Sequence, residues 1–310
     1  MPFLNLYILK MQTNKNITAY IALAVVSIVW GTTYFSLRIG VETFPPFMFS
    51  AIRHIVAGSL LLLILKIVGN LNLNKSIIIN QLILGILMIA LGSGVIGWCE
   101  RYIPSGLAAL IVSILPLYII GLNYLVGLER QKMNRQIVTG LCLGCIGITL
   151  IFKDNLKDFV NPTYLTGTLI TFGACFFWAI GSVYSAKNRL KGNSLLNAAL
   201  QMFFGGLALM AMSIFMDDYS ELQVINSDAI WSLVYLVIIG SVISYPCYVY
   251  ALEKLPIGLV SLYAYINPII ALILGYFLLN EKITYTTVLA LFSVTIGIYN
   301  INRGYQNNIK

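Results

Sequence analysis

The chain has 310 residues, of which 59% are hydrophobic and only 10% are charged, and its net charge is +8. A soluble domain carries about 25% charged residues, so the composition excludes a soluble globular protein and predicts an integral membrane protein. The positive charge lies mainly in the short breaks between apolar runs, which is typical of membrane loops and predicts no nucleic-acid partner.

Ten predominantly apolar runs follow one another along the chain, each close to the length of about 20 residues that a helix needs to cross a bilayer. They are too long and too continuously apolar for outer-membrane strands of about 10 residues. The predicted fold is therefore all-α, with ten transmembrane helices. The predicted spans are residues 17–37, 47–65, 79–98, 104–126, 136–152, 163–185, 195–216, 229–251, 257–279 and 285–302.

The stretch from Pro104 to Glu129 is repeated from Pro256 to Glu281, and both copies keep two prolines, a glycine and the final glutamate in one register. Upstream, Trp30 pairs with Trp178, Ala51 with Ala199, Gly58 with Gly206, and Gly92-Ser93 with Gly240-Ser241. We interpret this pattern as an internal duplication. The halves are residues 17–152 and 163–303, preceded by a leader (1–16), joined by a linker loop (153–162) and followed by a tail (304–310).

Five helices per half is an odd number, so the second half is expected to lie upside down relative to the first. Two inverted five-helix repeats are the architecture of many secondary transporters. If the N-terminus is cytoplasmic, thirteen Lys and Arg residues of the loops lie inside and five lie outside. Positive residues favour the cytoplasmic side, so we expect both termini in the cytoplasm.

Arg53 is the one cation well inside a predicted span. Placing it in the membrane costs on the order of 3 kcal/mol, so such a residue is usually paired or faces a wet cavity. We expect Arg53 to contact solute or to fix a helix by bonding to carbonyls or Glu100, with extension to the membrane surface as the alternative. His54 is a candidate for ion coupling because imidazole titrates near neutral pH; simple packing is the alternative.

Glu100 closes the third predicted span and is the carboxylate best placed for proton coupling, although a solvated loop charge is an equally simple interpretation. Other polar and aromatic residues of the spans are expected to line a substrate pocket, but Trp and Tyr also populate membrane interfaces. With Arg53, the substrate-binding candidates are Trp30, Tyr34, Trp98, Ser113, Trp178, Ser241, Tyr245, Tyr263 and Asn267.

Pro116 and Pro268 fall in the middle of equivalent spans, where each removes a helical hydrogen bond. We expect kinks that serve a gate, or kinks merely accommodated within the bundle. Gly140, Gly144 and Gly147 form a small-residue face for the tenth span or for a homodimer. No metal site, cofactor or enzyme motif is predicted, because the Cys142-x-x-Cys145 pair has no further ligands nearby.

The ten spans, the inverted duplication and the P-x-G-L…P…E signature resemble the drug/metabolite transporter superfamily, and within it the EamA-type ten-helix permeases. Trp30-Gly31-Thr32-Thr33-Tyr34 and Pro104-Ser105-Gly106-Leu107-Ala108-Ala109 are similar to the bacterial inner-membrane exporter branch. The resemblance implies a central cavity between the repeats and small metabolites such as amino acids as exported substrates. Gln201 stands where the first copy has Arg53, so the cavity is expected to be asymmetric.

These observations predict an inner-membrane permease that exports or exchanges small metabolites by alternating access, in contact with the lipid bilayer. A proton-coupled efflux pump for drugs or toxic metabolites is the alternative within the same class. A membrane protein that assembles with or senses others, without transporting anything, is the alternative outside it.

Overall fold

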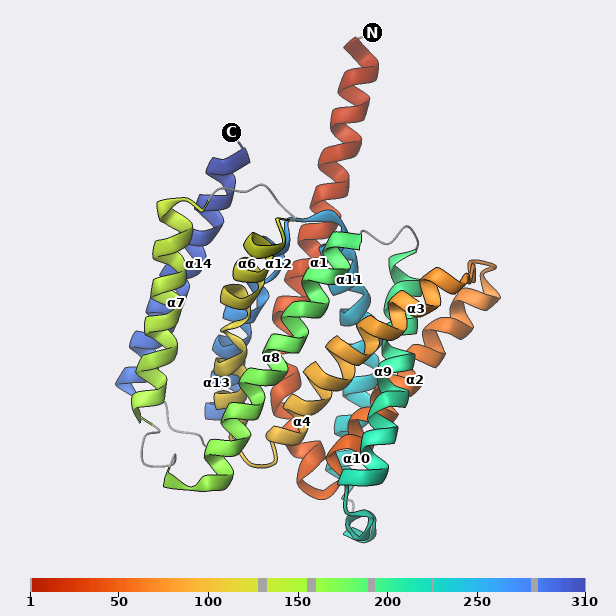
Figure 1. Cartoon of the computed structure of the whole chain (residues 1–310), viewed down its shortest axis with the longest axis vertical. Coiled ribbons are helices and arrows are strands. Elements are labelled where there is room, and N and C mark those ends of the chain that lie inside the picture. The colour runs from red at the N-terminus through yellow and green to blue at the C-terminus, as the bar shows by residue number, and fades with distance from the viewer. Residues whose placement is uncertain are drawn as a thin grey trace.

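The computed structural model describes residues 2–127, 133–154, 160–188, 193–224, 226–279 and 284–309, and within these ranges the chain is helical with short turns and has no β-strand. Glu129 and Glu281, the last residues of the duplicated stretch, lie outside the described residues. Figure 1 shows a bundle of long helices with both termini at the same end, and the first turns of α1 extend beyond the other helices.

The helices follow the order of the predicted spans. The first half contains α1 (Pro2–Thr43), α2 (Pro46–Ile67), α3 (Lys75–Leu84), η1 (Gly85–Gly94), α4 (Val95–Cys99), α5 (Ser105–Val112), α6 (Leu115–Val126) and α7 (Arg135–Asp154). The second half contains α8 (Pro162–Asn188), α9 (Ser194–Met216), η3 (Tyr219–Val224), α10 (Ser227–Tyr235), η4 (Leu236–Ile243), α11 (Ser244–Lys254), α12 (Ile257–Val260), α13 (Tyr263–Leu279) and α14 (Tyr285–Ile309).

Within the described ranges, 8 helical segments are long and apolar enough to cross a membrane. They correspond to the first four predicted spans of each half. The fifth and tenth predicted spans are the helices α7 and α14, but their apolar parts are shorter, Arg135–Gly147 and Val288–Ile301. An all-helical membrane protein is therefore confirmed, and the count of ten spans stays a prediction.

Small residues let equivalent helices of the two halves approach closely. A Cβ atom added at Gly58 on α2 would lie 2.7 Å from the carbonyl oxygen of Ala199 on α9, and one added at Gly206 would lie 3.2 Å from that of Ala51. Because Gly58 pairs with Gly206 and Ala51 with Ala199 in the duplication, these contacts are reciprocal. The contact between α2 and α9 therefore involves equivalent residues of the two halves.

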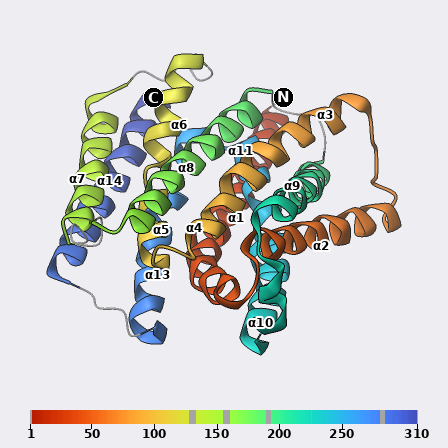
Figure 2. The same ribbon diagram turned by 60° about the horizontal axis from the view of Figure 1, so that its bottom comes forward.

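The helices α7 and α14 lie side by side at one edge of the bundle, apart from the crossing of α2 and α9 (Figure 2). A Cβ atom at Gly140 would lie 2.6 Å from the carbonyl oxygen of Gly297, and one at Gly147 would lie 3.0 Å from that of Ala290. Gly140 and Gly147 of the glycine face predicted on the fifth span therefore pack against α14 of the same chain, and Gly144 lies against Tyr265 of α13.

The third span of each half contains a π-helical stretch, η1 in the first and η4 in the second, and these stretches include the duplicated Gly92-Ser93 and Gly240-Ser241. The lengths of the apolar runs, from which the spans are predicted, do not predict these π-helical stretches. A π-helix displaces side chains from the regular α-helical register and is frequent at functional sites. Both stretches contribute residues to the cavity described below.

The fourth span of each half is interrupted, but not at equivalent positions. The first copy breaks at Ser113 and Ile114, so Pro116 lies in the first turn of the new helix α6. The second copy breaks at Ser261 and Leu262, and Pro268 lies inside the continuous helix α13. The span therefore divides next to Pro116, whereas the division near Pro268 comes six residues earlier.

Candidate functional site

A cavity of about 70 Å³ lies where helices of both halves meet. This volume holds a few water molecules, so a solute the size of an amino acid requires the surrounding helices to move apart. The cavity-lining residues are Trp30, Thr33, Tyr34, Leu37, Arg53, His54, Ile89, Ser93, Ile96, Val112, Leu115, Trp178, Gly240, Ser241, Tyr245 and Tyr263.

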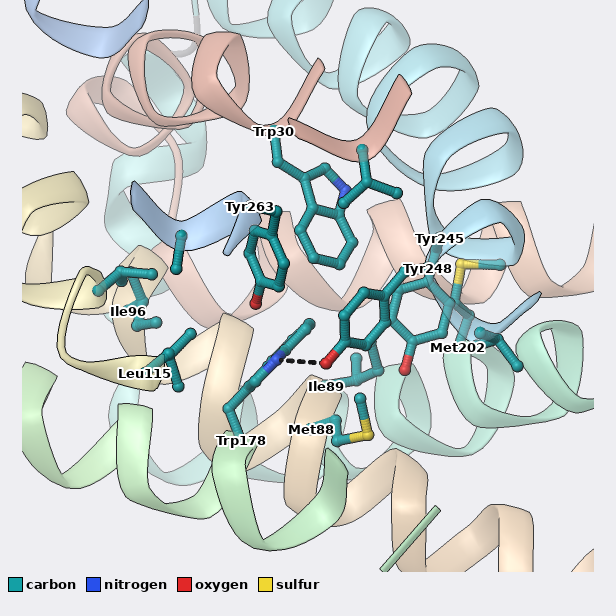
Figure 3. Packing of buried hydrophobic residues seen from close by; sticks show 14 of the residues in the cluster. Trp30, Met88, Ile89, Ile96, Leu115, Trp178, Met202, Tyr245, Tyr248 and Tyr263 are labelled. Atoms are coloured by element: carbon teal, nitrogen blue, oxygen red, sulfur yellow. Dashed lines mark hydrogen bonds between the residues drawn. The ribbon is translucent and has the colours of Figure 1, made fainter. Parts of the chain in front are cut away.

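Aromatic side chains make up one wall of the cavity (Figure 3). The duplicated residues Trp30 and Trp178 meet edge to face, with ring centroids 5.5 Å apart. Tyr248 is not a lining residue but packs against both rings, with centroid distances of 5.0 Å and 5.6 Å, and its hydroxyl accepts a hydrogen bond of 3.2 Å from Nε1 of Trp178. Tyr263 meets Trp30 edge to face at 5.1 Å. Such edge-to-face pairs are favourable and fix ring orientation, so the wall is preorganised.

Trp30 also connects the wall to the π-helix of the second half. Its Nε1 donates a hydrogen bond of 3.2 Å to the carbonyl oxygen of Gly240. The pairing satisfies an indole donor that would otherwise be buried without a partner. It also holds η4 against α1 at the point where both face the cavity.

Arg53 is turned into the protein, with only 7% of its surface exposed. Its Nε donates a hydrogen bond of 2.8 Å to Oγ of Ser241. His54 is also buried, and its Nδ1 lies 2.8 Å from the carbonyl oxygen of Ser50, to which it donates. The guanidinium of Arg53 therefore supplies the positive charge of the cavity, and among the lining residues there is no carboxylate to offset it.

Glu100 follows α4 directly and is completely buried, so it is not the solvated loop charge that the sequence allows. Neither of its carboxyl oxygens has a hydrogen-bond partner within the described ranges. Burial raises the pKa of this carboxyl well above its usual range, while the charges of Arg38 and Arg53 act against the rise. Burial disfavours the ionised form of the carboxyl, and nearby cations favour it.

A second hollow of about 380 Å³ lies beside the Glu100 hairpin and is lined by Arg38, Tyr102, Ile103, Pro104, Asn161 and Tyr164. Tyr102, Pro104 and Asn161 are exposed, so this hollow lies at the molecular surface. Arg38 donates a hydrogen bond to the backbone carbonyl of Glu100. Arg38 thus lines the surface hollow and contacts Glu100. Arg53, which lines the central cavity, acts on the carboxyl of Glu100 electrostatically.

A chain of buried polar groups leads away from the cavity toward the hairpin that follows α11. Tyr245 Oη donates to Gln201 Oε1 over 2.7 Å, and Gln201 Nε2 donates to Gln81 Oε1 over 2.6 Å. Gln81 Nε2 donates to Asn197 over 3.0 Å, and Asn197 Nδ2 donates to Glu253 over 3.3 Å. Glu253, in the last turn of α11, is therefore a partnered carboxylate, whereas Glu100, which follows α4 in the first half, has no such partner in the described part of the chain.

Two segments of the chain, residues 17–153 and 165–303, each match the EamA-like transporter family. Together they include nearly all of the described helices. The chain belongs to the EamA-like transporter family. The resemblance inferred from the sequence is confirmed, and the protein is a multi-pass membrane transporter.

Relatives of this EamA-like transporter cover most of its length. "Uncharacterized inner membrane transporter YedA" of Escherichia coli K12 is 31% identical over 286 residues, which are 91% of this chain and 90% of YedA. "Uncharacterized transporter YoaV" of Bacillus subtilis 168 is 24% identical over 88% of this chain and 93% of its own. A "Probable amino-acid metabolite efflux pump" of Escherichia coli K12 is 22% identical over 90% and 92%. The name of YedA supports an inner-membrane location.

A solved crystal structure shares the fold of this EamA-like transporter. The two align with a TM-score of 0.70 over 94% of this chain and 98% of the other, at 16% sequence identity. At this identity the likeness extends to the fold alone.

Three of the predicted substrate-binding residues of this EamA-like transporter do not line the cavity. Trp98 stacks on Phe47 with ring centroids 6.1 Å apart. Ser113 Oγ donates a hydrogen bond of 3.1 Å to the carbonyl oxygen of Ala264. Asn267 is completely buried, and in the orientation that satisfies both ends of its amide its Nδ2 donates to the carbonyl oxygens of Ser27 and Tyr263, each at 3.0 Å.

The other seven predicted substrate-binding residues and the coupling candidate His54 line the cavity, and Glu100 lies just outside it. Sequence reasoning missed Tyr248, Arg38 and Gln81. Tyr248 carried a usable signal, because it lies three residues after Tyr245 and therefore shares a helical face with it. Gln81 was also detectable as an amide within an otherwise apolar run.

Proposed function

We propose that this transporter exports or exchanges small metabolites, such as amino acids, by alternating access, with the central cavity as its solute site. The observation that carries the proposal is that aromatic residues of both halves, Trp30 and Trp178, surround one cavity together with the buried cation Arg53. A site at the meeting of two repeats can be opened toward either face by rocking one half against the other.

The topology belongs to the same proposal: ten spans in two inverted five-helix repeats, residues 17–152 and 163–303, with both termini cytoplasmic. The reciprocal contacts of α2 with α9 and of α7 with α14 support a two-fold relation between the halves. The two termini at one end of the bundle (Figure 1) support an even number of spans. The name of the efflux-pump relative supports export as the direction.

The breaks in the fourth spans provide places where the helices can bend. The turn at Ser113 and Ile114 precedes Pro116, and the turn at Ser261 and Leu262 precedes α13. Each turn contains a backbone hydrogen bond between residues three apart, such as the 3.0 Å bond from Ile114 N to Ile111 O. We place the moving joints of the transport cycle at these turns, with Pro116 at the start of α6 next to the first turn and Pro268 as a second point of bending within α13.

Counterflow in proteoliposomes tests the proposal. Vesicles holding the purified protein are loaded with amino acids and other small metabolites, with and without a pH gradient. Saturable exchange of at least one solute, lost in Trp178→Ala and absent from empty liposomes, supports the proposal. Exchange that Trp178→Ala leaves unchanged would contradict the cavity as the solute site.

The same experiment addresses a proton-coupled efflux pump for apolar cations, which the aromatic wall favours because cations bind over aromatic faces. Such a pump would exchange an organic cation, and the exchange would follow the pH gradient. The charge of Arg53, with no carboxylate among the lining residues, opposes this candidate.

A further inference from the structure

We propose that the solute carries a carboxylate that binds the guanidinium of Arg53, and that this binding requires a proton on the carboxyl of Glu100. The inference rests on the proposed function, because it takes the central cavity as the solute site. It adds the charge of the solute and a proton that travels with it.

The first support is the unused donor capacity of Arg53. Within the described ranges its only hydrogen bond is the one from Nε to Ser241. The two terminal nitrogens, which form the fork that recognises a carboxylate through two parallel hydrogen bonds, keep their donors. One of them, Nη2, lies near Gly240, which also lines the cavity, so the fork is placed at the solute space.

The second support is the charge of the surroundings. The cavity-lining residues include one guanidinium and no carboxylate. A bound anion would therefore neutralise the site, whereas a cation would be repelled. The rest of the lining is mainly aromatic and aliphatic. We therefore expect a monocarboxylate with an apolar body, and no charged group is available to fix an ammonium group on it.

The third support is the unpartnered acid next to this cation. Glu100 is completely buried, and both carboxyl oxygens lack hydrogen-bond partners in the described part of the chain. The groups that act on it electrostatically are Tyr34 and Arg38 from α1, Arg53 from α2 and Cys99 at the end of α4. On α8, Thr171 and Cys175 interact with Cys99, and on α2 His54 interacts with Arg53.

Glu100 and a solute carboxylate therefore both interact with the charge of Arg53, and Glu100 interacts more strongly still with the charge of Arg38. When Glu100 is ionised, its negative charge offsets Arg53 and opposes the entry of a second anion. When a proton from water binds a carboxyl oxygen of Glu100, an O–H bond forms and Arg53 is free to hold the solute carboxylate. No bond of the solute is broken. By reciprocity, the bound carboxylate favours the proton on Glu100 as much as the proton favours the carboxylate.

The consequence for transport is a solute and a proton that move together. One negative charge on the solute and one positive charge on the proton sum to zero, so their joint passage is electrically neutral. A pH difference across the membrane then drives the flux, and the membrane potential does not.

Binding to the purified full-length protein in lipid nanodiscs tests the inference, followed by the fluorescence of the cavity tryptophans and by calorimetry. The probes are monocarboxylates of increasing apolar size, from acetate and butyrate to benzoate and phenylpropionate, with benzamide and benzylammonium as neutral and cationic counterparts. At about pH 5 we expect the best carboxylate to bind at least tenfold more tightly than benzamide. Toward about pH 9 its affinity is expected to fall by up to about tenfold per pH unit.

Four variants test which residues cause the pH dependence and the preference for a carboxylate. Glu100→Gln, which imitates the protonated acid, is expected to bind the carboxylate with an affinity that no longer depends on pH. Glu42→Gln changes an exposed acid at the end of α1 and is expected to keep the dependence. Arg53→Gln is expected to lose the preference for carboxylate over amide, and Arg53→Lys is expected to keep part of it. Thermal unfolding curves show whether each variant is folded.

Three results would overturn the inference: a preference for benzamide or benzylammonium, a pH dependence that persists in Glu100→Gln, or no binding of any carboxylate in the series at any pH. If counterflow of neutral solutes occurs while every carboxylate fails to bind, the proposed function stands and this inference falls. If carboxylates bind with the expected pH dependence while no solute exchanges, the carboxylate site at Arg53 is supported and the proposed transport function is contradicted.

Discussion

Arg53 Nε donates a 2.8 Å hydrogen bond to Ser241 Oγ, and this bond joins the second span of the first half to the π-helix η4 of the second half. A guanidinium has several rotatable bonds, so one fixed hydrogen bond determines where its remaining donors point. The contact also places a charged hydrogen bond directly between the two halves of the chain.

Ser241→Ala tests the orienting role of this bond. A hydrogen bond to a charged group contributes about 1.5–3 kcal/mol, and part of that is recovered when water replaces the hydroxyl. We expect the affinity for a monocarboxylate to fall by about tenfold, with the preference for carboxylate over amide retained. Titration of benzoate and benzamide against wild type and variant measures both. An unchanged benzoate affinity would show that Ser241 does not orient Arg53.

Ser93→Ala is the matched control, because Ser93 is the duplicated counterpart of Ser241 and also lines the cavity. No hydrogen bond joins it to Arg53 in the described part of the chain. We expect its effect on benzoate affinity to be smaller than that of Ser241→Ala.

The buried carboxyl of Glu100 predicts a pH-dependent stability. Burial raises its folded-state pKa, whereas an unfolded glutamate titrates near pH 4.3. The protonated acid therefore favours the folded state. This contribution is complete below about pH 4.3 and is lost as the pH rises through the raised pKa.

Thermal unfolding of wild type and Glu100→Gln over a pH series measures this contribution. We expect the variant to gain stability relative to wild type as the pH increases, because the amide cannot ionise. Glu42→Gln, at an exposed position, serves as the control and is expected to leave the pH profile unchanged. A constant difference between Glu100→Gln and wild type at all pH values would contradict the burial of an unpartnered acid.

Ser113 satisfies a carbonyl that Pro268 leaves without a donor. The residue four before Pro268 is Ala264, and its carbonyl oxygen accepts a hydrogen bond of 3.1 Å from Ser113 Oγ. Ser113→Ala leaves this buried carbonyl without a hydrogen-bond donor, and we expect the free energy of unfolding to fall by about 1–3 kcal/mol.

In a Pro268→Ala background the backbone N–H is restored, and the same Ser113→Ala change is expected to cost less. A double-mutant cycle, with unfolding followed in detergent, isolates the coupling between the two positions. Strictly additive effects would mean that the serine does not serve the carbonyl freed by the proline.

Close helix contact predicts unequal effects for two glycines. A Cβ atom at Gly58 would lie 2.6 Å from the backbone nitrogen of Phe203, whereas one at Gly173 meets no atom within 4 Å. We expect Gly58→Ala to destabilise the protein by about 1–3 kcal/mol through overpacking. Gly173→Ala is expected to be neutral or stabilising by up to about 1 kcal/mol through helix propensity. Equal effects would contradict the close approach of α2 and α9.

The sequence was most informative where the membrane itself imposes the constraint. Spans follow from apolar length, and Arg53 turns inward because a charged group at that depth needs polar surroundings. The glycine face of α7 was predictable because only small residues permit the backbone of α14 to approach as it does.

Other features depend on tertiary contacts that a single span does not encode. Tryptophan residues occur at membrane interfaces as well as in pockets, so residue type alone does not distinguish Trp98 from Trp30. The burial of Glu100 results from Arg38 on α1 and the packing of neighbouring helices, which a hairpin sequence does not reveal. The π-helices η1 and η4 shift side chains by local rearrangement, and no residue type marks them.

Alternating access to the central cavity is tested most directly by a thiol placed within it. Ser93→Cys is a conservative change at a half-buried position of the lining. Membrane vesicles of both orientations are treated with an impermeant thiol reagent, and peptide mass spectrometry separates residue 93 from the five native cysteines. We predict labelling of residue 93 from either face, slowed by a bound monocarboxylate. Labelling from one face only, unaffected by any carboxylate, would contradict a solute site that opens alternately to the two sides.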